Sequence, residues 1–237
     1  MKKPFKFKQF TIYQDRCAMK VGTDGVLLGA WTSINKKPKS ILDIGSGTGI
    51  IALQMAQRCH AEVVDAIEVD ENAYEQCVEN FEASPWADRL FCYHAGLDEF
   101  VDEIEETYDL IISNPPFYSE KVSSGDVARD AARQNSSLPF DELLEGVSKL
   151  LSPQGVFSVI IPFKEEANFI ALAENLQLFA RRVTRVKGNP NSELKRSLLE
   201  LSFSKETAVE DELTIELARH KYTKEYIDLT KDFYLKM

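Results

Sequence analysis

The sequence predicts a single α/β domain, built on a doubly wound, mostly parallel sheet that ends in an antiparallel strand pair. Short apolar runs of strand length alternate with amphipathic runs of helical length from residue 40 onward. A glycine-rich turn at residues 45–49 joins one such strand to the helix that follows it. The chain has 237 residues, 44% hydrophobic and 28% charged, which is the size and composition of one globular domain.

Composition and charge exclude several classes of protein. No apolar run approaches the roughly 20 residues of a membrane span, and the basic start lacks the apolar core of a signal peptide, so we expect a cytoplasmic protein without membrane contact. Four cysteines without a CxxC pair and three scattered histidines complete no metal-ligand set. The net charge of -10 disfavours nonspecific binding to polyanions, so a nucleic-acid partner would need a local basic patch.

The first 35 residues precede the alternating pattern. A basic, aromatic opening leads into residues 11–13, which predict a short strand or an N-terminal hairpin. In residues 19–31, two glycines bracket Thr23 and Asp24 before an apolar run of helical length. The pattern alone favours Asp24 as the N-cap of this helix over a ligand contact.

Residues 40–53 predict a strand, a turn with glycines at positions 45, 47 and 49, and a helix. Glycine lets the backbone approach a ligand closely, and a helix N-terminus presents unpaired N–H groups and partial positive charge. The next strand, residues 63–70, places Glu68 about 20 residues further on, where an acid can bind both hydroxyls of a ribose. We expect Asp70 to cap the helix over 71–82. The pattern predicts a nucleoside ligand, and an ordinary βαβ unit with a surface glutamate is the alternative.

The expected strand at residues 108–113 ends in Asn114, Pro115, Pro116 and Phe117. The two prolines lack N–H groups and have fixed φ, so the carbonyls of Asn114 and Pro115 have no strand partners. Two acceptors and an aromatic ring suit a flat substrate with an exocyclic amino group, because the acceptors bind its hydrogens while Phe117 stacks on its plane. A strand that simply ends in an Asn-Pro turn is the alternative.

The second half continues the alternation of helices and strands. Residues 118–137 are polar without long periodicity, and they predict either a lid that contacts the substrate or disorder. Within them, Arg129 and Arg133 would either meet a substrate phosphate or remain solvated. The remaining elements are expected as helices at 140–151 and 164–177, strands at 156–162, 179–186 and 196–203, and a strand and amphipathic helix after residue 213.

A group of basic residues surrounds the expected turn at residues 188–191, and Glu193 is the one acid among them in the sequence. The group consists of Arg181, Arg182, Arg185, Lys187, Lys195 and Arg196. It is the local basic patch that a nucleic-acid partner would require. Charged residues on edge strands also prevent aggregation, and this is the alternative.

With these motifs the chain resembles the class I methyltransferases that use S-adenosylmethionine and methylate amino groups. Residues 41–49, Glu68 and the motif at 114–117 carry the resemblance, which covers essentially the whole chain. Residues 19–31, 222–226 and 233–235 add a narrower similarity to bacterial tRNA adenine-N6-methyltransferases. The resemblance implies a Rossmann-like fold with a seven-stranded sheet.

The resemblance also implies roles for individual residues. In that family the glycine turn contacts the methionine part of the cofactor, the acid at Glu68 binds ribose, and the 114–117 motif binds the target amino group. The implied cofactor-binding residues are Thr23, Asp24, Asp43, Gly45, Ser46, Gly47, Thr48, Gly49, Glu68, Val69 and Asn114. The implied catalytic residues are Asn114, Pro115, Pro116 and Phe117, and the implied RNA contacts are Arg129, Arg133 and the six residues of the basic patch.

One position departs from the family pattern. Gly96 stands after the expected third strand, residues 89–94, where many members have an acid that holds the adenine amino group of the cofactor. The resemblance then leaves this contact to the backbone or to Asp98. Residues 36–237 are expected to form the methyltransferase domain, and residues 1–35 an extension that packs on the cofactor site.

The implied activity is transfer of a methyl group from S-adenosylmethionine to N6 of an adenine in tRNA, at position 37, without a metal ion. S-Adenosylhomocysteine would be the other product, and a monomer is favoured. One alternative is methylation of a release-factor glutamine, which uses the same motif with a final tyrosine; the basic patch and the absence of a helical recognition domain before residue 41 favour RNA. The others are a DNA adenine methyltransferase and a non-catalytic cofactor-binding module.

Overall fold

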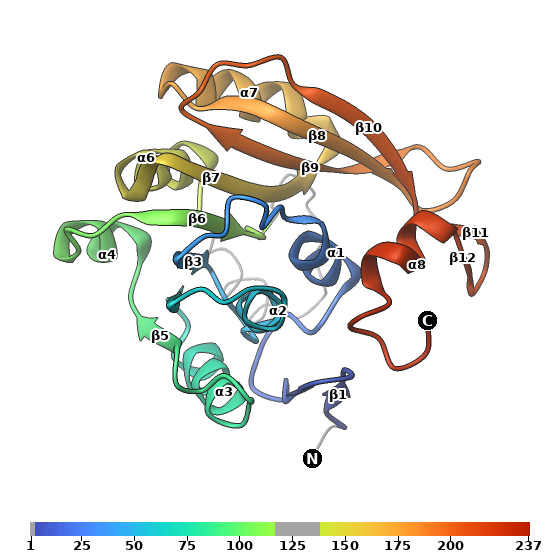
Figure 1. Cartoon of the computed structure of the whole chain (residues 1–237), viewed down its shortest axis with the longest axis horizontal. Coiled ribbons are helices and arrows are strands. Elements are labelled where there is room, and N and C mark those ends of the chain that lie inside the picture. Colours follow the sequence, from blue (N-terminus) through green and yellow to red (C-terminus); the bar gives the residue numbers. More distant parts are fainter. Residues whose placement is uncertain (1–2, 117–137) are drawn as a thin grey trace, which may run out of the picture.

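The computed structural model describes residues 3–116 and 138–237. Its centre is an eight-stranded sheet with the order β10-β8-β9-β7-β6-β3-β4-β5 (Figure 1). The strands are β3 (Ser40–Ile44), β4 (Val63–Glu68), β5 (Leu90–His94), β6 (Tyr108–Ser113), β7 (Leu151–Pro162), β8 (Phe179–Lys187), β9 (Leu194–Ser202) and β10 (Val209–Thr214). Neighbouring strands are parallel, except that β9 pairs antiparallel with both β7 and β8. The predicted fold class is confirmed, and β10 adds one strand to the seven expected, because it pairs with the outer edge of β8.

Helices cover both faces of this sheet. They are α1 (Thr23–Trp31), α2 (Ile50–Arg58), α3 (Glu71–Glu82), α4 (Leu97–Glu103), α6 (Phe140–Leu150), α7 (Glu166–Asn175) and α8 (Lys224–Thr230). One core cluster contains α1, α2, α3 and α8, and a second contains α4, α6 and α7 (Figure 1). Ile41 and Leu42 are consecutive in β3 and belong to different clusters, because side chains alternate across a strand. The central strands are therefore buried on both faces, which explains their continuous apolar runs.

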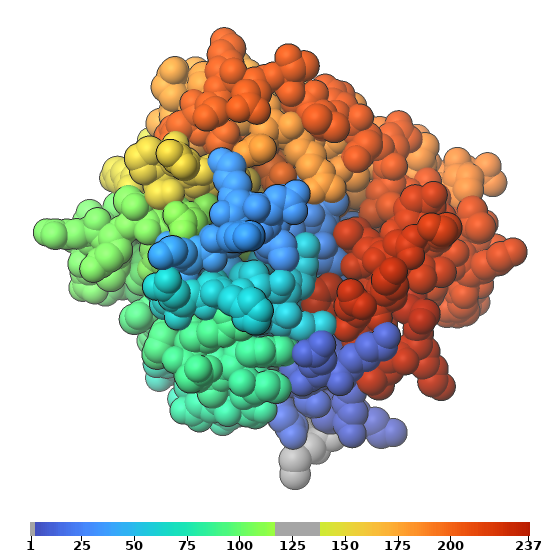
Figure 2. Space-filling model, viewed as in Figure 1, coloured from blue at the N-terminus to red at the C-terminus, as the bar shows by residue number. Residues whose placement is uncertain are grey.

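The N-terminal hairpin and the C-terminal segment lie side by side (Figures 1 and 2). β1 (Phe5–Lys6) and β2 (Thr11–Ile12) form a small hairpin, and Phe7 forms an isolated bridge with Tyr234. The backbone N–H of Lys8 donates to the carbonyl of Phe233 at 2.9 Å. Before α8, β11 (Glu216–Ala218) and β12 (Lys221–Tyr222) form a second short hairpin.

Helix starts test two of the local expectations. Asp70 caps α3, since its side chain accepts a hydrogen bond from the backbone N–H of Ala73 at 2.9 Å, which confirms the prediction. The prediction for Asp24 is wrong, because α1 is capped by Gly22 without a side-chain bond. The Asp24 carboxylate lies in the first turn of α1 and pairs with Arg196 of β9 at 2.8 Å, a contact between segments far apart in sequence.

Two helices are shorter than their patterns suggested. The helix expected over 164–177 starts as a 3-10 turn, Phe163–Glu165, and α7 continues to Asn175. The C-terminal helix is the seven-residue α8, which is followed by a turn whose side chains pack against the N-terminal hairpin. Among the described residues, no helix has both the length and the apolar character to cross a bilayer.

Candidate active site

A cavity of about 300 Å³ lies at the carboxyl ends of β3, β4 and β6. Parallel strands end at the same edge of a sheet, so the turns after them meet there. Residues of six segments line the cavity, at 17–19, 44–47, 67–73, 95–98, 113–116 and 138–142. The site thus brings together the glycine turn, the acid at the end of β4 and the Asn-Pro-Pro segment, which are separated in the sequence.

The three glycines of the turn after β3 have different surroundings. All three have positive φ, +73° at Gly45, +55° at Gly47 and +75° at Gly49, so other residues would be strained there. A Cβ added at Gly45 or Gly47 would meet nothing within 4 Å, whereas one at Gly49 would lie 2.5 Å from Phe81 Cε1 and 2.8 Å from Cys77 Sγ. Gly45 and Gly47 therefore leave backbone open toward the cavity, and Gly49 allows close packing of α2 on α3.

Glu68 ends β4 with its carboxylate at the cavity wall. Its Oε2 accepts a hydrogen bond from the backbone N–H of Gly47 at 2.8 Å, and its Oε1 accepts one from Asp70 at 3.0 Å. Burial raises the pKa of Glu68, and these backbone hydrogen bonds oppose the rise. The carboxylate is thus held in place between the first two strand ends, with acceptor capacity left for hydroxyl groups in the cavity.

Asn114 carries an unused acceptor in the same cavity. Its Oδ1 is buried and has no hydrogen-bond partner among the described residues, although a buried carbonyl oxygen of this kind is normally paired. Ser113 fixes the end of β6 by donating its hydroxyl to the carbonyl of Ile44 at 2.9 Å. Pro115 and Pro116 also line the cavity. An acceptor fixed in this way points to a ligand that donates hydrogen bonds.

Comparison with known proteins assigns the family. The family model described as Methyltransferase small domain matches residues 25–177 of this chain. The chain belongs to this methyltransferase family. A relative from Flavobacterium johnsoniae is 62% identical over 98% of this chain and 100% of the relative, and one from Bacteroides fragilis is 45% identical over 98% of each. Both are described as tRNA1(Val) (adenine(37)-N6)-methyltransferase.

Solved structures agree on the fold of this methyltransferase. A predicted O-methyltransferase from Agrobacterium tumefaciens superposes with a TM-score of 0.69, over 89% of this chain and 96% of that one, at 19% identity. At this identity the likeness shows the fold alone. The methyl donor of the class is S-adenosylmethionine, and the open backbone at Gly45 and Gly47 and the acid Glu68 fit such a ligand.

Several residues expected in the cofactor site of the methyltransferase support it from outside the cavity. Asp43 is fully buried and accepts a hydrogen bond from the Ala52 N–H at 3.2 Å, and burial raises its pKa to about 7. The Ser46 hydroxyl lies 3.5 Å from Cys77 Sγ, and the Thr48 carbonyl accepts a hydrogen bond from the Asn80 side chain at 2.9 Å. These side chains hold the glycine turn and do not line the cavity.

The first turn of α1 lies beside the cavity without lining it. Thr23 lines a different cavity, and Asp24 is paired with Arg196. Gly25 is the residue of this turn that lies next to the active site, because a Cβ added there would lie 3.9 Å from Asn114 Nδ2. The 19–31 segment is therefore next to the Asn-Pro-Pro segment through its backbone.

Sequence reasoning missed some of the cavity wall. Cys17, Ala18 and Met19 line it, as do Leu138 and Glu142 at the start of the α6 region. Met19 begins the 19–31 stretch and the first 35 residues were expected at the site, but no motif marked Cys17, Ala18, Leu138 or Glu142 individually. Asp98 lines the cavity too, beside Gly96, in agreement with one of the two contacts considered for the adenine of the cofactor.

Acidic residues from other elements pair with several cations of the basic patch, so the patch carries less net positive charge than its sequence suggests. Arg185 pairs with Glu166 at 2.6 Å and with Glu210 at 2.8 Å, and Lys187 pairs with Glu212 at 2.9 Å. Arg182 lies over the Trp31 ring at 4.2 Å, with Glu200 at 4.0 Å. The acids come from α7, β9 and β10, so the interpretation that Glu193 alone opposes the patch is wrong. Within the described part of the chain, Arg181 and Lys195 have no ion pair, so they remain the stronger predicted RNA contacts.

Three predicted site residues fall outside the described part of the chain. They are Phe117, Arg129 and Arg133. Their roles stay predictions from the sequence.

Proposed function

We propose that this methyltransferase transfers the methyl group of S-adenosylmethionine to N6 of an adenine in tRNA, at position 37 of tRNA1(Val), in the cytoplasm. The observation that carries the proposal is the unpaired, buried Oδ1 of Asn114 beside Pro115 and Pro116. A hydrogen-bond acceptor there suits an amino group better than a hydroxyl or a carbon nucleophile, because an amino group brings two hydrogens. The proposal is supported by relatives 42% to 62% identical over nearly the whole chain, which carry that name.

The cofactor supplies an electrophilic methyl group on a positively charged sulfur. Gly45 and Gly47 let the backbone approach its methionine part, and Glu68 accepts hydrogen bonds from the ribose hydroxyls. Asp98 lies where it can accept a hydrogen bond from the adenine amino group of the cofactor. These three contacts hold the donor without using the Asn114 side chain.

Asn114 and the residue after it orient the target amino group. The nitrogen is a poor nucleophile, because its lone pair is delocalised into the adenine ring. In the proposed complex Asn114 Oδ1 and the Pro115 carbonyl accept its two hydrogens, which directs the lone pair toward the methyl group. Phe117 is predicted to stack on the base, and aromatic stacking of this kind contributes about 1 to 3 kcal/mol. As the N–CH3 bond forms, the bond from the methyl group to sulfur breaks and S-adenosylhomocysteine is released. The methylated nitrogen then loses its extra proton to water.

The N-terminal extension is part of the proposed cofactor site. Cys17, Ala18 and Met19 line the cavity opposite the glycine turn, and Met19 is 53% exposed. Residues 13–16 are fixed to α3, since the backbone of Tyr13 and the side chain of Asn80 exchange hydrogen bonds at 2.8 and 2.9 Å. We infer that the extension covers bound cofactor from this side.

The experiment is transfer of labelled methyl from S-adenosylmethionine to unmodified tRNA, followed by nucleoside analysis. We expect N6-methyladenosine. The Asn114→Ala variant should lose transfer by about 100-fold or more, by analogy with the loss of one preorganised hydrogen bond in other enzymes, and should keep its affinity for the cofactor. Asn191→Ala, in an exposed turn, is the matched control. Label on a release-factor glutamine or on duplex DNA, with none on tRNA, would contradict the proposal.

A further inference from the structure

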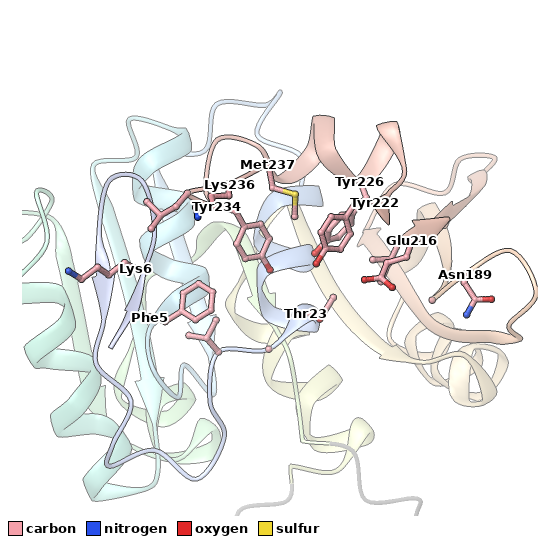
Figure 3. Close-up of a pocket in the computed structure, with 15 residues that line it drawn as sticks. Phe5, Lys6, Thr23, Asn189, Glu216, Tyr222, Tyr226, Tyr234, Lys236 and Met237 are labelled. Atoms are coloured by element: carbon pink, nitrogen blue, oxygen red, sulfur yellow. The ribbon is translucent and has the colours of Figure 1, made fainter. Parts of the chain in front are cut away.

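A second cavity, of about 760 Å³, is lined by Gly22 and Thr23 at the start of α1 (Figure 3). It is formed by the N-terminal segment, the turn between β8 and β9, and the C-terminal part of the chain. Its main side chains are Phe5, Asn189, Glu216, Tyr222, Tyr226 and Tyr234. We call it the tyrosine cavity. Neither the cofactor nor the target adenine accounts for it, because both are assigned to the cavity at the strand ends.

Aromatic rings form the walls of the tyrosine cavity. The rings of Tyr222 and Tyr226 lie 5.3 Å apart, and Tyr234 lies 6.2 Å from Phe5. Tyr226 is 2% exposed, so it supports the more exposed Tyr222 ring, and its backbone N–H donates to the Thr223 hydroxyl that caps α8. Because α8 fixes Tyr226, this wall is preorganised. Flat aromatic walls in a cavity of this size suit a flat ligand.

Polar groups inside the tyrosine cavity specify the kind of flat ligand. Figure 3 shows the hydroxyls of Tyr222, Tyr226 and Tyr234 near one another, with the Glu216 carboxylate beside them. Burial raises the pKa of both Tyr226 and Tyr234, whose side chains form a hydrogen bond with each other. Glu216 forms no ion pair with any described residue. A free carboxylate accepts hydrogen bonds, so Glu216 favours a base that carries an amino group. Lys6 and Lys236 also line the cavity, and their positive charges suit the phosphates of the same nucleotide.

The tyrosine cavity is adjacent to the reaction site. Thr23 lines it, and Gly25, two residues further on, lies next to Asn114 of the active site. Thr23 and Gly25 belong to the same turn of α1 and lie about 3 Å apart along its axis, because an α-helix rises about 1.5 Å per residue. A nucleotide near the target adenine in the same RNA loop can therefore enter the tyrosine cavity while the target base lies at Asn114.

The geometry points to the tyrosine cavity as the binding site for a second, unstacked base of the RNA substrate, one that carries an exocyclic amino group. Proteins that read RNA loops commonly stack splayed bases on aromatic side chains and bind their polar edges. The inference rests on the proposed function, since it takes tRNA as the substrate. It adds a recognition contact outside the site of methyl transfer. This contact explains how the protein selects one RNA loop although most cations of its basic patch are paired with acids.

The test uses the full protein with an unmodified anticodon stem-loop RNA. We expect Tyr222→Leu to raise KM for this RNA by about tenfold, because stacking of one base contributes about 1 to 3 kcal/mol. The kcat at saturating RNA and the affinity for S-adenosylmethionine should not change. Leu217→Ala is the matched control, because Leu217 is 54% exposed in the same segment and does not line the cavity. Unchanged KM in Tyr222→Leu, with an unaltered melting temperature, would overturn the inference.

A series of RNA loops with one abasic position each identifies the bound base. At that position the unaltered protein should bind more weakly, and Tyr222→Leu should cause no further loss. The inference would be contradicted if Tyr222→Leu weakened binding by the same factor for every loop of the series, whichever position is abasic. Glu216→Lys separates a base from a phosphate, since it should raise KM for an amino-bearing base, and a lower KM would show that phosphate binds instead.

The two proposals fail in different ways. If the unaltered protein methylates no RNA, the proposed function fails and the inference fails with it. If the unaltered protein forms N6-methyladenosine and the Tyr222 and Glu216 variants match the Leu217 control, only the inference about the tyrosine cavity fails.

Discussion

Two glycines of the turn after β3 offer a direct test of how the site is divided between binding and packing. Gly47→Ala and Gly49→Ala both place alanine at positive φ, which costs about 1 to 2 kcal/mol in each variant. Only Gly49→Ala also forces a methyl group to within 2.5 Å of Phe81 and 2.8 Å of Cys77. Overpacking of this kind costs about 1 to 3 kcal/mol more.

The two variants should therefore differ in stability and in cofactor binding. We expect Gly49→Ala to unfold about 5 to 15 °C below the unaltered protein, since about 1 kcal/mol shifts the melting temperature by about 2 to 4 °C in a chain of this size. The melting temperature of Gly47→Ala should fall less, because this variant has only the conformational cost of alanine at positive φ. Its methyl group points into open space at the cofactor cavity, so its affinity for S-adenosylmethionine should fall tenfold or more, a change of about 1.4 kcal/mol.

Thermal and urea unfolding measure the first difference, and calorimetric titration with S-adenosylmethionine measures the second. The difference in unfolding free energy between the two variants isolates the crowding at Phe81, because the cost of positive φ is common to both. Equal stability of Gly47→Ala and Gly49→Ala would refute the packing role of Gly49. Unimpaired cofactor binding by Gly47→Ala would refute the assignment of the open backbone to the ligand.

Three further predictions address single side chains. Glu68→Gln should weaken S-adenosylmethionine binding in calorimetry, and unchanged affinity would remove Glu68 from the ribose. Burial raises the pKa of Asp43 to about 7, so its charged form destabilises the fold. The free energy of unfolding should therefore fall as pH rises from about 4 to 7. Asp43→Asn should raise the melting temperature at pH 8 more than at pH 5. Arg181→Ala should weaken tRNA binding with a shallower salt dependence, whereas Arg185→Ala should lower the melting temperature, because it leaves the buried Glu166 unpaired.

Much of the fold was predictable because it is encoded locally. Alternation of buried strands with amphipathic helices predicts a parallel sheet, and the carboxyl ends of its strands must then meet at one edge. The glycine turn, Glu68 and Asn114 each follow a strand, so their convergence on one cavity follows from the pattern. The additional strand β10 was not predictable in this way, since a short polar edge strand has no strong periodicity.

The orientation of neighbouring side chains is a different matter. Ser46 and Gly47 are consecutive, yet one packs on Cys77 and the other faces the cavity. Sequence reasoning assigned every residue of the turn to the ligand because the motif marks the segment as a whole. Which atoms face the ligand depends on how closely α3 packs against the turn, and this is set by contacts distant in sequence.

The sequence by itself determined the parallel sheet and the position of the functional residues at the carboxyl ends of its strands, because these depend on periodicity. It also determined the acceptor chemistry of the Asn-Pro-Pro segment, because this depends on the fixed geometry of proline. Tertiary structure alone decided which charges pair across β8, β9 and β10, and it alone created the tyrosine cavity. That cavity joins Phe5, Asn189 and Tyr222. No local pattern connects residues so far apart, and only tertiary packing brings the N-terminal segment, the β8–β9 turn and the C-terminal part of the chain together.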